Sequence, residues 1–388
     1  MHKLIATLLL ATVVHAEEAR FAALDKTLDG LVARKMTAGG IVVVAEKGQR
    51  THLKLFGEAA PGKPMKEDTI FRIYSMSKPV TAVAALILVD EGKLELDAPI
   101  AKYLPALKDL KVQGKTANEG KPARAPTVRD LFTHTAGFTY GWGASPVDLK
   151  YRRLKVLGSP DLAAMVGRLQ QIPLVMEPGA RWHYGVSTDV LGAVVEAVAK
   201  QPLDTFMRER IFVPLKMVDT GFHVPKEKID RLGANYGRRL EVVDAPATSR
   251  YGKPATFFSG GGGLVSTAGD YLRFALMLRN GGEFEGKRIL KAETVQAMRT
   301  NQLEEKLIPI RFGPMPMPGT GFGLGVSVFV AKDPPLQHGE YGWAGAASTV
   351  FTILPEPDAI LITMVQQMPI NMAPHMMAKG ELLKVLAK

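Results

Sequence analysis

Segments with strand character lie near the two ends of this chain, and a long, mainly helical stretch separates them. Two strand-forming runs joined by a turn at Lys47 and Gly48 come early in the chain, and three more come late. Their β-branched and apolar sequences mark them as strands at residues 41–45, 52–56, 325–330, 348–354 and 359–365. Antiparallel strands from both ends can share one sheet, so the helical stretch is predicted to be an insertion.

The predicted fold is α/β (α+β), with an antiparallel sheet flanked by helices from the two ends of the chain. Apolar residues at helical spacing predict one such helix over residues 17–36 and another over residues 376–387. We expect an α/β sheet domain made of residues 17–90 and 320–388, and a mainly helical inserted domain over residues 91–319. An active site is expected in the groove between the two parts.

Residues 1–16 have the pattern of a secretory signal peptide. Lys3 gives the positive start, residues 4–14 form an apolar run, and Val14 and Ala16 supply small side chains where a signal peptidase reads them. Cleavage after Ala16 predicts a periplasmic or secreted protein. No stable membrane insertion is expected after cleavage, because no other apolar run is long enough to span a bilayer. The alternative is an N-terminal helix that belongs to the core.

The composition excludes several kinds of site. The chain has no cysteine, which excludes disulfides, a thiolate nucleophile and cysteine-bound metals, and its eight histidines are not at metal-ligand spacing. We therefore expect neither a metal nor a cofactor. The formal charge of +11 becomes +10 without Lys3 (11 − 1), and the basic residues are mixed with acidic ones. This distribution favours a solvated surface over nucleic-acid binding.

Ser75 and Lys78 stand at the start of a strongly apolar segment, residues 80–89, which is predicted to be a buried helix. Residues three apart share one helix face, so the Ser75 hydroxyl and the Lys78 amine can meet there. A serine becomes a good nucleophile when a neighbouring base takes its proton, and a helix terminus offers N–H groups to an oxyanion. The alternative is a capping serine followed by a surface lysine, which the apolar helix disfavours.

Three motifs occur in the order found in the serine β-lactamase and penicillin-binding-protein superfamily, which this chain resembles. They are Ser75-x-x-Lys78, the segment 184–192 that begins with Tyr184, and Gly342-Trp343-Ala344-Gly345-Ala346. Segments 131–137 and 261–268 support the match. The resemblance covers nearly all of the chain after residue 16, and it is strongest to class C β-lactamases and, within that branch, to family VIII carboxylesterases. It implies a β-lactamase-like fold and a serine hydrolase.

The resemblance also implies roles for individual residues. Ser75 matches the acylated nucleophile, Lys78 its partner, and Tyr184 the tyrosine that shuttles protons together with the lysine. A phenol can act as a base beside an ammonium because the cation favours the phenolate. The oxyanion hole is expected from the backbone N–H groups of Ser75 and Ala346, and Gly345 lets a substrate approach the backbone closely.

Two departures from the β-lactamase pattern favour an ester substrate. Trp343 stands where β-lactamases carry a lysine that pairs with the substrate carboxylate, and the family VIII esterases share this change. Val186 replaces the asparagine that holds the amide of a β-lactam. Both changes remove a polar anchor, and the Trp343 indole offers a flat apolar wall of the substrate pocket to an acyl or alcohol group.

Three further features lie close to these motifs in the sequence. His338 precedes Trp343 of the third motif by five residues and is a candidate for lining the substrate pocket. His134 is expected to be a buried or capping histidine. The Met/Pro segment 314–318 is expected to be a loop that borders the cleft and shapes acyl selectivity.

The predicted function is a serine carboxylesterase that hydrolyses short-chain esters through an acyl-enzyme on Ser75. Its partner is a small-molecule ester, and weak action on β-lactams stays open. One alternative is a β-lactamase or D-Ala-D-Ala peptidase with the same serine, lysine and tyrosine. Another is a non-catalytic binding protein on this scaffold, which the presence of Ser75, Lys78 and Tyr184 disfavours. A third is acyl transfer to an acceptor other than water.

Overall fold

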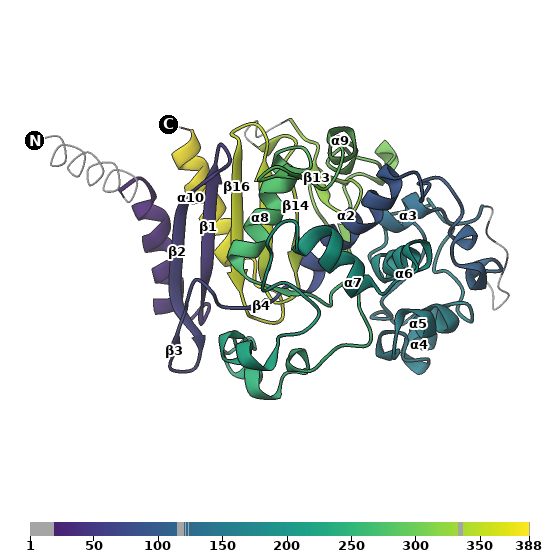
Figure 1. Ribbon diagram of the computed structural model, residues 1–388, viewed down its shortest axis with the longest axis horizontal. Helices are drawn as coiled ribbons and strands as arrows, with labels where there is room; N and C mark the ends of the chain where they lie inside the picture. Colours follow the sequence, from purple (N-terminus) through teal and green to yellow (C-terminus); the bar gives the residue numbers. More distant parts are fainter. Residues whose placement is uncertain (1–18, 115–119, 121, 123, 333–336, 388) are drawn as a thin grey trace, which may run out of the picture.

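The computed structural model describes residues 19–114, 120, 122, 124–332 and 337–387, and its largest sheet has eight strands (Figure 1). Neighbouring strands of this sheet are all antiparallel. From edge to edge they are β12 (Thr320–Phe322), β13 (Ser327–Phe329), β14 (Tyr341–Gly345), β15 (Thr349–Leu354), β16 (Ala359–Val365), β1 (Gly39–Glu46), β2 (Gln49–Ala60) and β3 (Lys63–Pro64). The pairing of β1 with β16 joins the two ends of the chain, and the predicted fold class is confirmed.

Both faces of the central strands are covered, which explains their continuous apolar sequence. Val42 of β1 packs in one core cluster with the helix at residues 19–33 and with α10 (Ala373–Leu386). Its neighbour Val43 belongs to the main core on the opposite face, where α8 (Ala268–Arg279) lies against β1 and β16. Successive side chains of a strand point to opposite faces, so a run without polar positions fits a strand buried on both sides.

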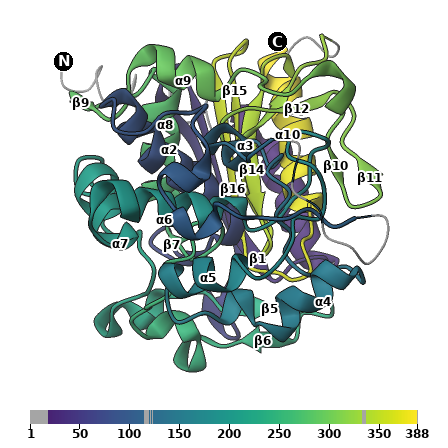
Figure 2. The same cartoon turned by 90° about the vertical axis from the view of Figure 1, so that its right-hand side faces the viewer.

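The rest of the molecule is mainly helical and is built around α2 (Ser77–Asp90) (Figure 2). Residues 77–88 of α2 are all buried, and the helix packs against α6 (Ser187–Ala199). This burial accounts for the apolar sequence of α2, which a surface helix would not have. The other α-helices of this part are α3 (Val128–Phe132), α4 (Pro146–Arg153), α5 (Leu162–Leu169), α7 (Leu203–Met207) and α9 (Ala292–Met298).

Two helices pack across the predicted division of the chain. α2 lies within residues 17–90, which were assigned to the sheet domain, but it packs against α6. α8 lies within residues 91–319, the predicted insertion, but it packs against the sheet. The domain boundaries therefore stay a prediction.

Short strand pairs complete the structure: β4 (Phe71–Arg72) with β7 (Val265–Ser266), β5 (Asn235–Tyr236) with β6 (Val242–Asp244), β8 (Glu283–Phe284) with β9 (Lys287–Arg288), and β10 (Arg311–Phe312) with β11 (Met315–Pro316).

The two ends of the chain carry helices close to the predicted positions. The helix expected over residues 17–36 is observed over residues 19–33, and the one expected over residues 376–387 lies in α10. The predicted signal peptide, residues 1–16, lies outside the described residues. Within the part of the chain that the structure describes, no helix has both the length and the apolar character needed to cross a bilayer.

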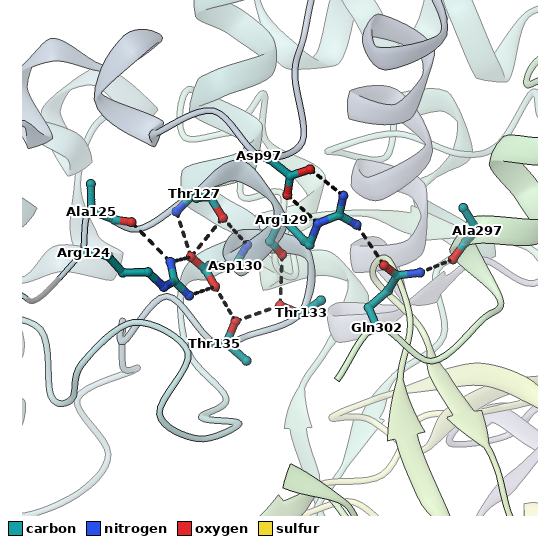
Figure 3. Close-up of polar contacts among 10 residues, drawn as sticks. All are labelled: Asp97, Arg124, Ala125, Thr127, Arg129, Asp130, Thr133, Thr135, Ala297 and Gln302. Carbon is teal, nitrogen blue, oxygen red and sulfur yellow. Dashed lines mark hydrogen bonds and ion pairs between the residues drawn. The ribbon is translucent and has the colours of Figure 1, made fainter. Parts of the chain in front are cut away.

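A hydrogen-bond network holds the segment 131–137 from one side (Figure 3). The Asp130 carboxylate accepts hydrogen bonds from both terminal nitrogens of Arg124, at 2.5 and 2.8 Å. It also accepts from the Thr127 backbone N–H and from the Thr135 hydroxyl, each at 2.8 Å. Burial raises the pKa of Asp130, but these hydrogen bonds outweigh burial and hold it below the usual value for an aspartate.

Arg129 holds the same segment from the other side of α3 (Figure 3). Its guanidinium donates to the two carboxylate oxygens of Asp97 at 2.7 and 2.9 Å, and to the side-chain oxygen of Gln302 at 2.8 Å. The Gln302 amide in turn donates to the Ala297 carbonyl at 3.0 Å. Three distant parts of the chain are thereby joined at α3, which fixes the residues that follow it.

We predict that Asp130→Ala lowers the free energy of unfolding at pH 7 by about 2–3 kcal/mol, because Arg124, Thr127 and Thr135 lose their acceptor. The native pKa of Asp130 is depressed, so its stabilisation is present above the ordinary aspartate pKa of about 4 and is lost as the pH falls through the native value. Urea denaturation at pH 7 and pH 3 measures both effects. Asp109→Ala, at a well-exposed aspartate, is the control. If the difference in free energy of unfolding between wild type and Asp130→Ala is as large at pH 3 as at pH 7, the prediction is contradicted.

Candidate active site

Ser75 lies where the sheet meets the helical part of the molecule. After β4 the chain forms a 3₁₀ turn, Tyr74–Met76, and α2 begins directly after it. The Tyr271 hydroxyl of α8 donates to the Met76 carbonyl at 2.9 Å and ties this turn to the core. Tyr74 has a φ of 39°, a conformation that side chains other than glycine rarely adopt. The surrounding contacts therefore hold a strained backbone immediately before Ser75.

Lys78 is buried, with only 1% of its surface exposed, and its ammonium makes three hydrogen bonds. It donates to Ser75 Oγ at 3.1 Å, to the Tyr140 hydroxyl at 2.8 Å and to the Gly261 carbonyl at 2.7 Å. A lysine ammonium has three N–H donors, so these acceptors satisfy all of them. The structure thus brings Ser75 and Lys78 together, as their spacing suggested.

Tyr184 lies over the same ammonium. Lys78 Nζ is 4.5 Å from the centroid of the Tyr184 ring, which is a cation–π distance. The Trp343 indole N–H donates to the Tyr184 hydroxyl at 3.4 Å, so residues of the second and third motifs meet here. Gly185, next to Tyr184, lets the backbone pack closely against Phe138, because a Cβ at residue 185 would lie only 2.2 Å from the Phe138 carbonyl oxygen.

Tyr140 also belongs to this site, although the sequence did not single it out. Its hydroxyl accepts the hydrogen bond from Lys78, and its ring stacks on Trp142 with 4.4 Å between centroids and 15° between planes. Burial raises the pKa of Tyr140 well above its usual value, and the nearby Tyr184 adds to this effect. The hydroxyl is therefore protonated at neutral pH. The sequence offers only a slight signal for Tyr140: it comes three residues after the segment 131–137 and is followed by Gly141.

The third motif lies against the turn that carries Ser75. The Thr349 hydroxyl donates to the Ile73 carbonyl at 3.3 Å. A Cβ on Gly345, the last residue of β14, would lie only 2.2 Å from the same carbonyl oxygen, so this close approach requires glycine. Ala346 follows directly, in the turn to β15. The backbone of this turn is thus next to the segment that leads to Ser75.

Aromatic side chains surround Tyr184 and Trp343. The ring centroid of Tyr184 is 4.9 Å from that of Phe312, at the β10–β11 hairpin, and 6.4 Å from that of Trp142. Trp142 is 68% exposed, Phe312 40%, and Met315 on the same hairpin 67%. The buried members of this aromatic cluster are His134, Trp182 and Phe322. An exposed apolar rim therefore stands beside the lysine and the two tyrosines.

Other residues chosen from the sequence lie elsewhere or are buried. The structure places His338 on an exposed turn, where its Nδ1 is 3.1 Å from the Ala331 carbonyl oxygen, and not in the aromatic cluster of the described residues. Val186 is fully buried at the start of α6, so its side chain faces the core. His134 is buried with its ring centroid 4.9 Å from that of Tyr184, and burial lowers its pKa well below the usual value.

Most of the chain matches one known family. A sequence profile of the Beta-lactamase family matches residues 24–385. The chain belongs to this family. As a member of the Beta-lactamase family with esterase relatives, it is a serine hydrolase.

Three relatives of this Beta-lactamase family member show how far the likeness extends. Protein Rv1367c of Mycobacterium tuberculosis (strain ATCC 25618 / H37Rv) is 38% identical over 353 residues, which cover 86% of this chain and 87% of that protein. Esterase EstB of Burkholderia gladioli is 34% identical over 277 residues, covering 65% of this chain and 68% of EstB. The solved structure of EstCE1, described as a hydrolase with promiscuous acyltransferase activity, has a TM-score of 0.83 at 24% identity, covering 95% of this chain and 99% of EstCE1, and shares the fold.

We predict that Tyr140→Phe lowers kcat/KM by about 10- to 100-fold, because the Lys78 ammonium loses one of its three acceptors and its position becomes less well defined. The variant is expected to fold, since the ring and its stacking on Trp142 are kept, but with a lower melting temperature because a buried donor loses its acceptor. Hydrolysis of p-nitrophenyl acetate measures kcat/KM. Tyr103→Phe is the matched control, because the Tyr103 hydroxyl accepts a hydrogen bond from the Glu95 backbone far from this site. A folded Tyr140→Phe with wild-type kcat/KM would refute the role of Tyr140.

Proposed function

We propose that this serine hydrolase is a carboxylesterase of the family VIII type, which hydrolyses short-chain esters through an acyl-enzyme on Ser75. The observation that carries the proposal is the contact between Ser75 Oγ and the buried Lys78 Nζ, at 3.1 Å, beneath an exposed aromatic rim. A serine next to a buried lysine is a candidate nucleophile, and an apolar rim favours substrates with apolar acyl or alcohol groups.

In the first step Ser75 Oγ attacks the carbonyl carbon of the ester, and its proton passes to the Lys78/Tyr184 pair. A bond forms between Oγ and the carbonyl carbon, and the carbonyl oxygen becomes an oxyanion. The backbone N–H groups of Ser75 and Ala346 would stabilise this oxyanion. The bond from carbon to the alcohol oxygen then breaks, and Tyr184 gives the leaving alcohol its proton. Lys78 supports this exchange because its positive charge lies 4.5 Å from the Tyr184 ring centroid and attracts the negative charge that develops in the transition state.

In the second step water attacks the acyl-enzyme. The same Lys78/Tyr184 pair takes a proton from the water, the oxyanion forms again, and the bond between the carbonyl carbon and Ser75 Oγ breaks. The pair then passes this proton to Ser75 Oγ, and release of the acid completes the cycle. Tyr140 serves in both steps by holding the Lys78 ammonium in place through its hydroxyl, at 2.8 Å.

The preference for esters over β-lactams and peptides rests on the side chains at two motif positions. Trp343 offers an indole in place of a lysine, and its N–H is directed at Tyr184 and not at a substrate carboxylate. Val186 is buried, so the second motif offers no side-chain amide at this position. A substrate held by a carboxylate and an amide would lose both anchors, whereas an apolar ester needs neither.

We also infer that residues 1–16 are removed on export and that the mature enzyme is periplasmic or secreted. The support is the sequence pattern of a signal peptide, with Val14 and Ala16 before the expected cleavage point. N-terminal sequencing of the protein released from cells tests this inference. A mature chain that still begins at Met1 would overturn it.

The proposed reaction predicts that Ser75→Ala abolishes ester hydrolysis, with a loss of kcat of about 10³-fold or more, because no acyl-enzyme can form. Purified wild type and variant are compared on p-nitrophenyl acetate and butyrate. Ser77→Ala is unsuitable as a control, since the Ser77 hydroxyl accepts a buried hydrogen bond from Leu264. Ser145→Ala, at the N-cap of α4, removes a serine hydroxyl far along the chain. Unchanged activity in Ser75→Ala would overturn the assignment.

The alternatives are separated in the same assays. A kcat/KM for nitrocefin above that for the butyrate ester would identify a β-lactamase instead. Failure of a fluorophosphonate to label wild-type Ser75 would support a non-catalytic binding protein. Transfer of the acyl group to an added alcohol, measured as formation of the new ester, would show that an acceptor other than water is used.

The exposed rim predicts its own effect on substrate preference. Trp142→Ala and Phe312→Ala are expected to raise KM for p-nitrophenyl butyrate by about 5- to 20-fold through lost apolar contact. The rise should be smaller for the acetate, which has less apolar surface to bury. Val218→Ala is the control, because Val218 is a 72% exposed apolar residue on another loop. Equal KM values for wild type and both rim variants would show that the rim does not touch the substrate.

A further inference from the structure

A buried carboxylate that the proposed reaction does not use lies next to the active-site lysine. Asp189 is in the first turn of α6 and has none of its surface exposed. Its Oδ1 accepts hydrogen bonds from the Ser259 hydroxyl at 2.5 Å and from the Gly261 backbone N–H at 3.1 Å. Its Oδ2 has no hydrogen-bond partner among the described residues. A buried, incompletely paired carboxylate is costly, so its presence calls for a reason.

Gly261 links this carboxylate to the lysine. Its N–H donates to Asp189, while its carbonyl accepts the hydrogen bond from Lys78 at 2.7 Å. The packing is tight, because a Cβ on Gly261 would lie 2.4 Å from Asp189 Oδ2 and 3.1 Å from the Tyr140 hydroxyl. A Cβ on the preceding Gly260 would lie 2.7 Å from the Thr188 carbonyl oxygen. The glycine segment therefore rests directly on the first turn of α6, and only residues without a side chain fit there.

The charges around Lys78 favour a counter-ion at this position. Burial raises the pKa of Asp189 above its usual value, and the positive charge of Lys78 and the hydrogen bonds from Ser259 and Gly261 only partly oppose that rise. Tyr140 and His134, which also face Lys78, are uncharged at neutral pH, because burial raises the pKa of the first and lowers that of the second. Tyr184 faces Lys78 with its ring. Among these groups, Asp189 is the one that can carry a negative charge opposite the Lys78 ammonium.

We propose that Asp189 is a positioning residue for Lys78. It holds Gly261, whose carbonyl accepts a hydrogen bond from the ammonium, and its negative charge stabilises the positive charge of that ammonium. This inference rests on the proposed function, in which Lys78 acts on Ser75. Asp189 is hydrogen-bonded to Ser259 and Gly261 and not to Ser75, so in this proposal it acts through the lysine. An ammonium held by a fixed carbonyl and a nearby carboxylate keeps its direction toward Ser75 Oγ during the reaction.

The test is Asp189→Asn, which keeps the shape of the side chain and removes its charge. The rate constant for labelling of Ser75 by a fluorophosphonate is measured from pH 5 to pH 10, because this reaction does not depend on the choice of ester. We expect the rate to fall by about 10- to 100-fold, as for the weakening of one charge-assisted contact. The pH profile of the labelling rate should also shift, because the substitution removes the titratable carboxyl group next to the site.

Asp270→Asn is the matched control. Asp270 is also a buried aspartate in the first turn of a helix, α8, and it accepts hydrogen bonds from the Asp219 N–H at 2.7 Å and the Thr220 hydroxyl at 2.9 Å. We expect this variant to lose stability without a shift of the pH profile. A folded Asp189→Asn with the wild-type rate and pH profile, or with the same behaviour as Asp270→Asn, would overturn the proposal.

Ser259→Ala keeps the test decisive where Asp189→Asn does not fold. This variant frees the carboxylate from one hydrogen bond without removing its charge, and we expect a fall in labelling rate of about 3- to 10-fold. An unchanged rate in folded Ser259→Ala would count against Asp189 as a positioning residue. Labelling of wild-type Ser75 without ester hydrolysis would overturn only the proposed substrate class. Absence of labelling in the wild type would overturn the proposed function and the role of Asp189 together.

Discussion

The arrangement of three segments of this protein depends on the burial of one positive charge, the Lys78 ammonium. An ammonium taken out of water must receive hydrogen bonds from the protein, and Lys78 obtains them from three segments that are far apart in the chain. The turn before α2 provides Ser75, a glycine-rich loop of the helical part provides Tyr140, and the glycine segment beside α6 provides the Gly261 carbonyl. Displacement of any of these segments leaves a buried donor unsatisfied, so the stability of the fold and the geometry of the site depend on the same contacts.

Local sequence patterns were enough to predict most of the fold and one contact of the site. The β-branched runs predicted β1 and β16 because each residue of a doubly covered strand is buried, and the apolar pattern of α2 reflects its burial in the same way. Ser75 and Lys78 could be paired because they are three residues apart, within reach of one helical turn. In these cases the information lies in neighbouring residues.

Contacts between distant loops could not be predicted in this way. Tyr140 is 62 residues from Lys78 and Gly261 is 183 residues from it, and no periodic pattern connects them. The position of α8 on the sheet has the same cause, since an amphipathic helix does not specify which surface it covers. Nearness in sequence can also mislead: His338 lies only five residues before Trp343 of the third motif, yet it is on an exposed turn. Distance along the chain is a poor guide where loops make the site.

The pairing of β1 with β16 has a consequence for how the protein reaches its folded state. These strands lie at opposite ends of the chain, and the turn with Ser75 comes soon after β1, whereas the third motif comes just before β16. A ribosome makes the nucleophile early but cannot complete the surrounding strands until almost the whole chain has been synthesised. A truncated chain that ends before β14 carries Ser75 but lacks the strands that lie beside it in the folded protein.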